Sequence, residues 1–170
     1  MHWADHTAQR LSEKYGSQVI ASGITPSGEF HIGHLREILT AEMIHRACLD
    51  AGEKSEYIFI VDSMDPLRRV YDFLSDDYEK YIGCPLAYIP SPNPDGTPNY
   101  EGESYAMHFL NPFLDALKQI GVNPVVVMNH ETYDKGLFAE KIDIAINRRE
   151  EIRNVIEEIS SRELPKEWYP

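Results

Sequence analysis

Residues 19–34 are Val-Ile-Ala-Ser-Gly-Ile-Thr-Pro-Ser-Gly-Glu-Phe-His-Ile-Gly-His, and this stretch decides the fold. Its apolar start predicts a short buried strand over residues 18–21, and the turn-forming residues 22–28 predict a loop. A helix over residues 31–51 should follow, because apolar side chains recur there at helical spacing. Two histidines flank one glycine where that helix begins. A helix N-terminus carries unpaired N–H groups and partial positive charge, so the pattern predicts a phosphate site.

The rest of the chain repeats this alternation of strands and helices. Apolar runs predict buried strands over residues 57–61 and 124–128, and helical periodicity predicts helices over residues 2–15, 104–120 and 137–161. Together they predict an α/β fold with an open parallel sheet of the Rossmann-like type. Ligands bind such sheets beyond the carboxyl ends of the strands. We therefore expect residues 23–34, 62–69 and 129–133 to meet at one crevice.

Residues 66–103 have a different composition. Proline and glycine are frequent there, and residues 89–98 consist almost entirely of turn-forming types. Long loops in compact domains tend to be functional or mobile. We interpret this stretch as an inserted, loop-rich connective segment at the mouth of the sheet.

Composition limits the classes of function. The chain has 170 residues and a formal net charge of −12, from 28 acidic and 16 basic residues, which argues against a broad nucleic-acid-binding face. It contains no apolar run long enough to cross a membrane. The two cysteines, Cys48 and Cys84, are far apart and have no CxxC partner, so they predict neither a disulfide framework nor a metal site. Reduced thiols favour a cytoplasmic location.

The candidate site residues follow from their chemistry. The imidazoles of His31 and His34 would donate hydrogen bonds to phosphates, and Gly33 would allow a nucleotide to approach the backbone closely. Asp62 follows a buried strand, where it fits either a turn or cap, or the recognition of an ammonium group or a ribose. His130 and Glu131 lie at the next strand end and fit a substrate role or a structural one.

Several separate blocks carry a family resemblance. Residues 21–28 and 31–37 resemble the HIGH region of class I aminoacyl-tRNA synthetases, and among these the class I lysyl-tRNA synthetases. The resemblance continues over the whole chain, through the residues that follow: Trp3-Ala4-Asp5, Asp65-Pro66-Leu67-Arg68, Tyr81-Ile82-Gly83, Pro85-Leu86, Ser104-Tyr105-Ala106, His108-Phe109, Pro112-Phe113-Leu114, Glu131-Thr132-Tyr133, Pro165 and Trp168-Tyr169-Pro170. It departs from the family at Ser63, where a second aspartate is usual, and at Tyr71, where a proline is common.

The resemblance implies an activity and a set of roles. The reaction would be activation of L-lysine by ATP with Mg²⁺, followed by transfer of the lysyl group to tRNA(Lys). His31 and His34 would be catalytic, and the ATP-binding residues would be Pro26, Ser27, Gly28, His31, Gly33 and His34. Gly23, Thr25, Asp62, Glu131 and Tyr133 would bind lysine, with no metal held by the protein itself.

Members of the family are much longer than this chain. They continue into a zinc-binding segment, a second half of the nucleotide fold with a lysine-rich KMSKS-type loop, and an anticodon-binding domain. We therefore expect residues 1–170 to be the N-terminal part of the catalytic domain, with tRNA(Lys) bound mainly by regions absent here. Half of such a sheet predicts self-association or a complementing polypeptide.

Two alternatives remain open. One is a non-catalytic nucleotide- or lysine-binding module, either truncated or paralogous. The other is a small nucleotidyltransferase, a class that also uses a His-x-Gly-His motif. Such enzymes share a late Ser-Ser-Thr-x-x-Arg-like motif, which Ile159-Ser160-Ser161-Arg162 matches only faintly.

Overall fold

A computed structural model describes residues 2–14 and 16–170. The chain forms two compact units, Met1–His130 and Glu131–Pro170, and each is considered by itself below. Within the described residues, no helix is both long enough and apolar enough to cross a membrane.

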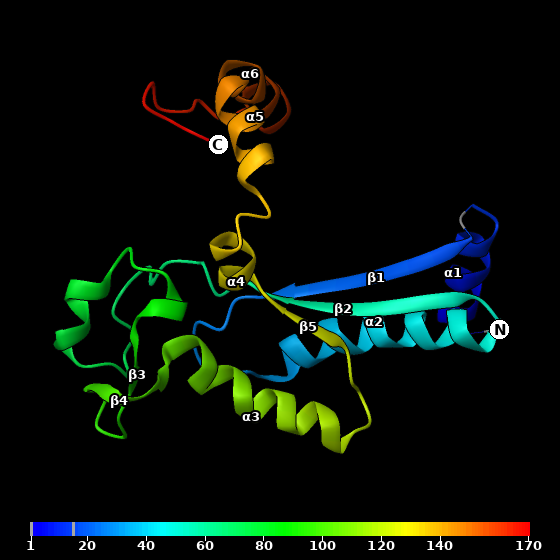
Figure 1. The fold of residues 1–170 in the computed structure, drawn as a ribbon, viewed down its shortest axis with the longest axis horizontal. Coiled ribbons are helices and arrows are strands. Elements are labelled where there is room, and N and C mark those ends of the chain that lie inside the picture. Colours follow the sequence, from blue (N-terminus) through cyan, green and yellow to red (C-terminus); the bar gives the residue numbers. More distant parts are fainter. Residues whose placement is uncertain (1, 15) are drawn as a thin grey trace. The chain divides into compact units, whose positions relative to one another are not determined.

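The first unit is built on a parallel sheet of three strands. These are β1 (Ser17–Ile24), β2 (Lys54–Val61) and β5 (Val125–Met128), in the order β1-β2-β5. Ile24 lies opposite Val61, and Val61 lies opposite Met128, so the three strands end at the same edge. Figure 1 shows the sheet with its helices. The predicted α/β fold with a parallel sheet is confirmed.

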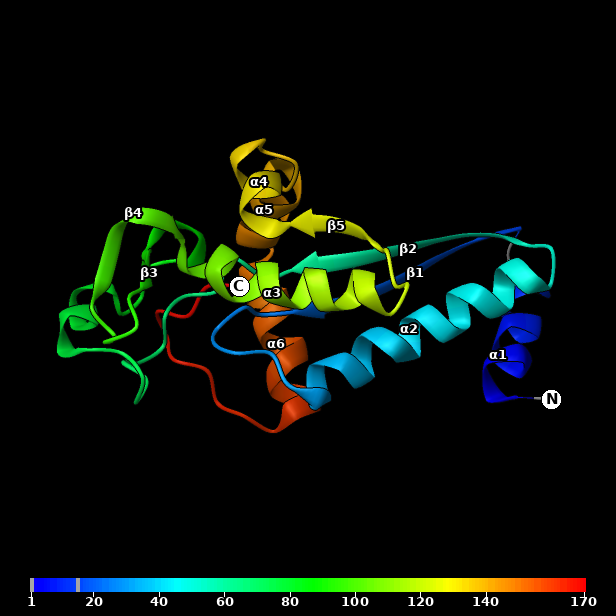
Figure 2. The same cartoon turned by 90° about the horizontal axis from the view of Figure 1, so that it is seen from below.

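Two long helices, α2 (Ile32–Asp50) and α3 (Tyr105–Gln119), connect the strands and lie on the same side of the sheet (Figures 1 and 2). Parallel strands require such crossovers, because the chain must return to the starting edge before it can pair again. The main core fills the space between sheet and helices; its buried members are Ile24, Ile38, Ala41, Tyr57, Phe59, Val61, Leu110, Phe113, Leu117 and Val122. The short helix α1 (Trp3–Ser12) packs separately against the end of α2 through Ala4 and Ala8. Tyr15, in the helix predicted over residues 2–15, lies outside the described residues.

The segment over residues 66–103 has more order than its composition suggests. It contains two 3-10 helices, η1 (Asp76–Tyr81) and η2 (Leu86–Tyr88), and an antiparallel pair, β3 (Pro90–Pro92) with β4 (Pro98–Ser104). A second core cluster organises it; the buried members are Leu67, Leu74, Tyr78, Leu86, Ile89, Tyr105, Ala106 and Phe109. Because three of these residues belong to α3, the segment is fixed to the helix that follows it.

Helix and strand limits differ from the sequence prediction in three places. The strands β1 and β2 extend past the predicted ranges. At the start of β2, Lys54 pairs in the ladder although it is exposed, and at the end of β1, residues 22–24, predicted as loop, pair with Phe59–Val61. Residues 129–133 form most of a helix, α4 (Asn129–Asp134), directly after β5. The single helix predicted over 137–161 is two helices, α5 (Ala139–Asn147) and α6 (Arg149–Ser160). The backbone of Arg148 leaves the helical region between them, with φ −105° and ψ 22°, a change that apolar periodicity does not reveal.

Candidate functional site

The carboxyl edge of the sheet brings distant segments together. Thr25, just after β1, donates its hydroxyl to the Asp65 carboxylate at 2.7 Å. Asn129, just after β5, donates its side-chain amide to the Asp62 carboxylate at 2.9 Å. Asp62 itself extends the β1–β2 ladder, because its N–H donates to the Ile24 carbonyl at 3.0 Å. The start of the first segment, at Ile24 and Thr25, therefore meets residues 62–65 and Asn129 as expected.

His31 and His34 cap α2 reciprocally. His31 precedes the helix, and its Nδ1 accepts the N–H of Gly33 at 3.1 Å. The Nδ1 of His34 accepts the N–H of His31 at 3.0 Å. This is the geometry of a capping box, in which two side chains satisfy two otherwise unpaired N–H groups of the first turn. The two rings lie against each other, with centroids 3.9 Å apart.

The cap determines which imidazole nitrogen carries the proton. A nitrogen that accepts a hydrogen bond is unprotonated, so a neutral ring of this kind has its hydrogen on Nε2. Each histidine therefore has an Nε2–H donor that the cap does not use. Burial lowers the pKa of His34, and His31 lowers it further, although Glu37 opposes the shift. His34 is thus held in the neutral form that the cap requires.

Gly33 lies against the ring of His31. A Cβ added there would come within 2.8 Å of Cε1 of His31, so a larger residue would displace the capping ring. Gly33 also lines a groove of about 370 Å³ between β1 and α2, together with Ser22 and Glu37. That volume falls within the range of small-molecule sites, roughly 300–1,000 Å³.

The loop before α2 is held from the core side. Pro26 is fully buried, and the carbonyl of Ser27 accepts the hydroxyl of buried Tyr105 at 2.8 Å. Burial raises the pKa of Tyr105, so it remains a neutral donor. Gly28 faces Phe73, whose ring carbons would lie 3.6 Å from an added Cβ. These contacts fix the loop while its backbone leads into the histidine cap.

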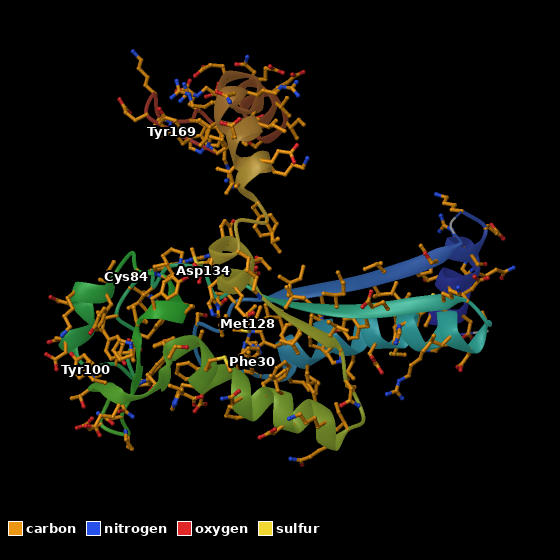
Figure 3. All side chains as sticks on the ribbon, viewed as in Figure 1. Phe30, Cys84, Tyr100, Met128, Asp134 and Tyr169 are labelled. Atoms are coloured by element: carbon orange, nitrogen blue, oxygen red, sulfur yellow. The ribbon has the colours of Figure 1, made fainter. Side chains whose placement is uncertain are left out.

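Phe30 supports the same turn. Its ring stacks on Phe113 of α3 at 4.3 Å, and it lies 5.0 Å from the ring of His34. Figure 3 labels Phe30 at the start of α2, near α3. A core contact therefore sets the position of the residue that precedes the cap.

Asp62 lies in an acidic setting. Its Oδ2 faces Gly23, since a Cβ on that glycine would stand 3.6 Å from this oxygen. Burial raises the pKa of Asp62 and the nearby Asp65 raises it further, while the hydrogen bond from Asn129 acts in the opposite direction. Glu37 also contributes to the raised pKa, and it accepts the N–H of Gly23 at 3.3 Å. A cation at Oδ2 of Asp62 would relieve this accumulation of negative charge.

Ser63, which differs from the aspartate usual in the family it resembles, has a structural role here. The residue is fully buried, and its hydroxyl oxygen accepts the N–H of His130 at 3.1 Å. The same oxygen lies 2.8 Å from Nδ1 of His130. A hydrogen-bonded serine at this position ties the end of β2 to the end of β5.

Glu131 and Tyr133, the remaining candidates, belong to the second unit. Within it, Glu131 pairs with Lys135 at 3.0 Å, and the ring of Tyr133 lies 5.0 Å from that of Phe138. Their expected role toward lysine stays a prediction.

Sequence reasoning gave no role to Glu37, Asn129 or Ser63. For Glu37, the sequence did contain a signal of its place near the site. It follows His34 by three residues, so the two side chains lie on the same face of the helix. The pairing of Asn129 with Asp62 has no such local signal, because 67 residues separate them. In the described part of the chain, no group of three or more histidine, cysteine, aspartate or glutamate side chains is arranged to hold a metal ion.

Comparison with known families gives a match over the whole chain. The family model described as "tRNA synthetases class I (K)" matches residues 1–170.

Curated relatives agree with this match. The chain is 45% identical over 172 residues to a lysine–tRNA ligase of Archaeoglobus fulgidus, and 45% identical over 174 residues to one of Methanocaldococcus jannaschii. It is 42% identical over 170 residues to lysine–tRNA ligase 1 of Methanosarcina acetivorans. All of this chain is covered in each case, but only 33%, 31% and 31% of the respective relatives. The chain therefore spans about a third of the length of the relatives it matches.

The cap contact of His31 predicts a measurable stability effect. His31→Ala removes the acceptor for the N–H of Gly33 and should lower the free energy of unfolding by about 1 kcal/mol, the usual cost of losing an N-cap. His31→Asn keeps a good capping acceptor and should restore most of that loss. Urea unfolding of the three proteins measures the effect. Equal stability of the alanine and wild-type proteins would contradict the cap.

The lowered pKa of His34 predicts an effect of acid on stability. The unfolded chain, with a histidine pKa near about 6.5, binds a proton more readily than the folded chain does. Stability contributed by His34 should therefore fall as the pH drops through this value, and level off below the lower pKa of the folded state. His34→Gln keeps an acceptor but does not titrate, so the difference between wild type and this variant isolates the effect. The measurement is urea unfolding of both proteins between about pH 7.5 and pH 5. The contributions of the other titrating groups cancel when the two free energies of unfolding are subtracted. A difference in the free energy of unfolding that does not change with pH would contradict the predicted effect of His34.

Proposed function

Because the chain belongs to the family of class I tRNA synthetases designated K, we propose that it forms the ATP- and lysine-binding part of a lysine–tRNA ligase. The observation that carries the proposal is the position of two kinds of group at one sheet edge. Two neutral imidazole donors begin α2, and an acidic group follows the neighbouring strand β2. The phosphates of ATP need hydrogen-bond donors, and an ammonium group of lysine needs a carboxylate.

The phosphates of ATP would lie at the start of α2. His31 and His34 would donate from Nε2 to phosphate oxygens, where charge increases in the transition state. The partial positive charge of the helix N-terminus would add to this attraction. Gly33 would leave room for the adenosine in the groove beside β1, and Pro26, Ser27 and Gly28 would shape the loop around the phosphates. Mg²⁺ would arrive with ATP.

Lysine would lie at the ends of β1 and β2. An ammonium group of lysine would bind Oδ2 of Asp62, which faces Gly23. Thr25 would line the same pocket, although its hydroxyl hydrogen is directed to Asp65. We also assign Glu131 and Tyr133 to the lysine site.

The reaction would proceed in two steps. The lysine carboxylate attacks the α-phosphorus of ATP, a P–O bond forms, and pyrophosphate leaves, which gives lysyl-adenylate. The lysyl group then passes to the 3′ end of tRNA(Lys), and AMP is released. Regions beyond these 170 residues would supply most of the tRNA contacts, since the net charge here is −12.

Lysine-dependent exchange of pyrophosphate into ATP tests this function with a matched pair of variants. His34→Gln and His34→Glu both keep an acceptor at the third helical position, as in a capping box, but only glutamine keeps an N–H donor. In a protein that carries these residues together with the second half of the nucleotide fold, we expect exchange by the wild type, a loss of about 100-fold or more in His34→Glu, and a loss of about tenfold or less in His34→Gln. Urea unfolding provides the control that both variants fold.

The outcomes separate the candidate functions. ATP binding without lysine-dependent exchange would favour a non-catalytic nucleotide-binding module. A chain that binds neither ATP nor L-lysine would overturn the proposal. If both variants fold and lose the same amount of exchange activity, the N–H of His34 does not act on the phosphates.

We further propose that the chain works in the cytoplasm and associates with a second copy or a complementing polypeptide. Cys48 and Cys84 are free thiols, as a reducing compartment favours. In the described part of the chain, β1 and β5 are the outer strands of the sheet, and their Val19 and Val125 are 64% and 50% exposed. Unpaired strand edges with apolar side chains favour association.

Sedimentation velocity tests the association. We expect the wild type to form a dimer or larger species at about 100 μM, a concentration at which weak interfaces are populated. Val19→Lys should shift it toward monomer, because a charge on an edge strand opposes pairing. Leu49→Lys replaces a residue of similar exposure, 48%, near the end of α2 and serves as the control. A wild type that sediments as a single monomeric species would contradict association with a second copy.

A further inference from the structure

Two consecutive residues after β2 contact two consecutive residues at the end of β5. Asp62 accepts the side-chain amide of Asn129 at 2.9 Å. Ser63, the next residue, accepts the N–H of His130 at 3.1 Å. The two contacts lie side by side in the chain, and only the first reaches a residue of the candidate site.

The Ser63–His130 contact has the features of a clasp. Since the Ser63 oxygen accepts a backbone N–H, its own hydrogen is free to donate to Nδ1 of His130, 2.8 Å away. The serine is fully buried, and its carbonyl accepts the N–H of Ala87 at 3.0 Å. The ring of Tyr88 meets the ring of His130 edge to face, with centroids 5.9 Å apart. The clasp therefore fixes the backbone immediately after Asn129.

The Asn129 contact fixes the direction of the Asp62 carboxylate. One oxygen, Oδ1, accepts the amide of Asn129, and the other, Oδ2, faces Gly23 at the end of β1. The charged groups that act on this carboxylate are Asp65 and Glu37, and both disfavour its ionised form. The amide of Asn129 favours that form by donating a hydrogen bond to it.

We propose that Asn129, held in place by the Ser63–His130 clasp, is a positioning residue that keeps the Asp62 carboxylate ionised and directs it at an ammonium group of the ligand. The inference rests on the function proposed above, in which Asp62 binds an ammonium group of L-lysine. In this inference, Asn129 and Ser63 orient the Asp62 carboxylate before lysine binds, and neither residue contacts lysine itself. Asn129 acts through Asp62, and Ser63 acts through Asn129.

The first measurement needs no ligand. Titration of the Asp62 carboxyl by NMR reports its pKa directly. Asn129→Leu has nearly the same shape but no donor, so the pKa of Asp62 should rise further than in the wild type. Ser63→Ala releases the clasp and should move the pKa in the same direction. Asn111→Leu is the matched control, because Asn111 donates in the same way to Glu103, at 2.6 Å, on an exposed surface away from Asp62.

The second measurement is binding of L-lysine across a range of pH. The wild type should lose affinity as the pH falls through the raised pKa of Asp62, because a protonated carboxyl no longer attracts an ammonium group. In Asn129→Leu this loss should occur at higher pH, and affinity at neutral pH should weaken by about tenfold, the value of one hydrogen bond to a charged group. The double variant Ser63→Ala/Asn129→Leu should bind no more weakly than Asn129→Leu alone, because the two residues act in sequence.

The outcomes distinguish this inference from the proposed function. An unchanged pKa of Asp62 in folded Asn129→Leu would overturn the positioning role, and if that variant does not fold, Ser63→Ala decides in the same way. Effects of the two substitutions on affinity that simply add would overturn the role of the clasp. A pKa that shifts as expected in a chain that binds no L-lysine would support the positioning of Asp62 and overturn the proposed ligand.

Discussion

Eight consecutive residues of β1 pair with eight of β2 in parallel, from Ser17 opposite Lys54 to Ile24 opposite Val61, and the site depends on this register. It places Thr25 within hydrogen-bond distance of Asp65, and it allows Asp62 to extend the ladder by one bond to Ile24. Side chains alternate between the two faces of a strand, so a shift of one residue would turn Asp62 away from Gly23. The buried side chains of β2 prevent that shift, because it would expose Phe59.

The histidine cap shows how one pair of side chains is used for both stability and chemistry. Most helix caps use the short side chains of serine, threonine, aspartate or asparagine, whose polar atoms all lie close to the backbone that they cap. An imidazole has two nitrogens, so Nδ1 of His31 or His34 can satisfy a backbone N–H while Nε2 remains available. The cap also orders both rings before any ligand is present. Pre-ordered donors lose little freedom when they meet a charge, which is the condition for effective electrostatic stabilisation.

The sequence was a good guide wherever a pattern repeated locally. Apolar runs predicted the three parallel strands. Helical periodicity predicted the helix that begins at the histidines, because the side chains that one helix face buries recur at regular spacing. It was a poor guide where one residue decides the outcome, as at Arg148, where a single backbone conformation separates α5 from α6. Contacts across long separations were also missed. The partners of Asp62 and Ser63 lie 67 residues later, and only the folded sheet brings them together.

The two sides of the site differ in charge, and this difference argues for two ligand groups of opposite charge. At the ends of β1 and β2, Asp62 experiences the negative charge of Asp65 and Glu37, while the exposed guanidinium of Arg68 is paired with Asp65. An anion placed there would add to the repulsion, whereas a cation would remove it. At the start of α2 the side chains are neutral donors, and the helix adds partial positive charge. A ligand set that carries an ammonium group and a phosphate satisfies both sides at once, whereas a single anion or a single cation satisfies only one.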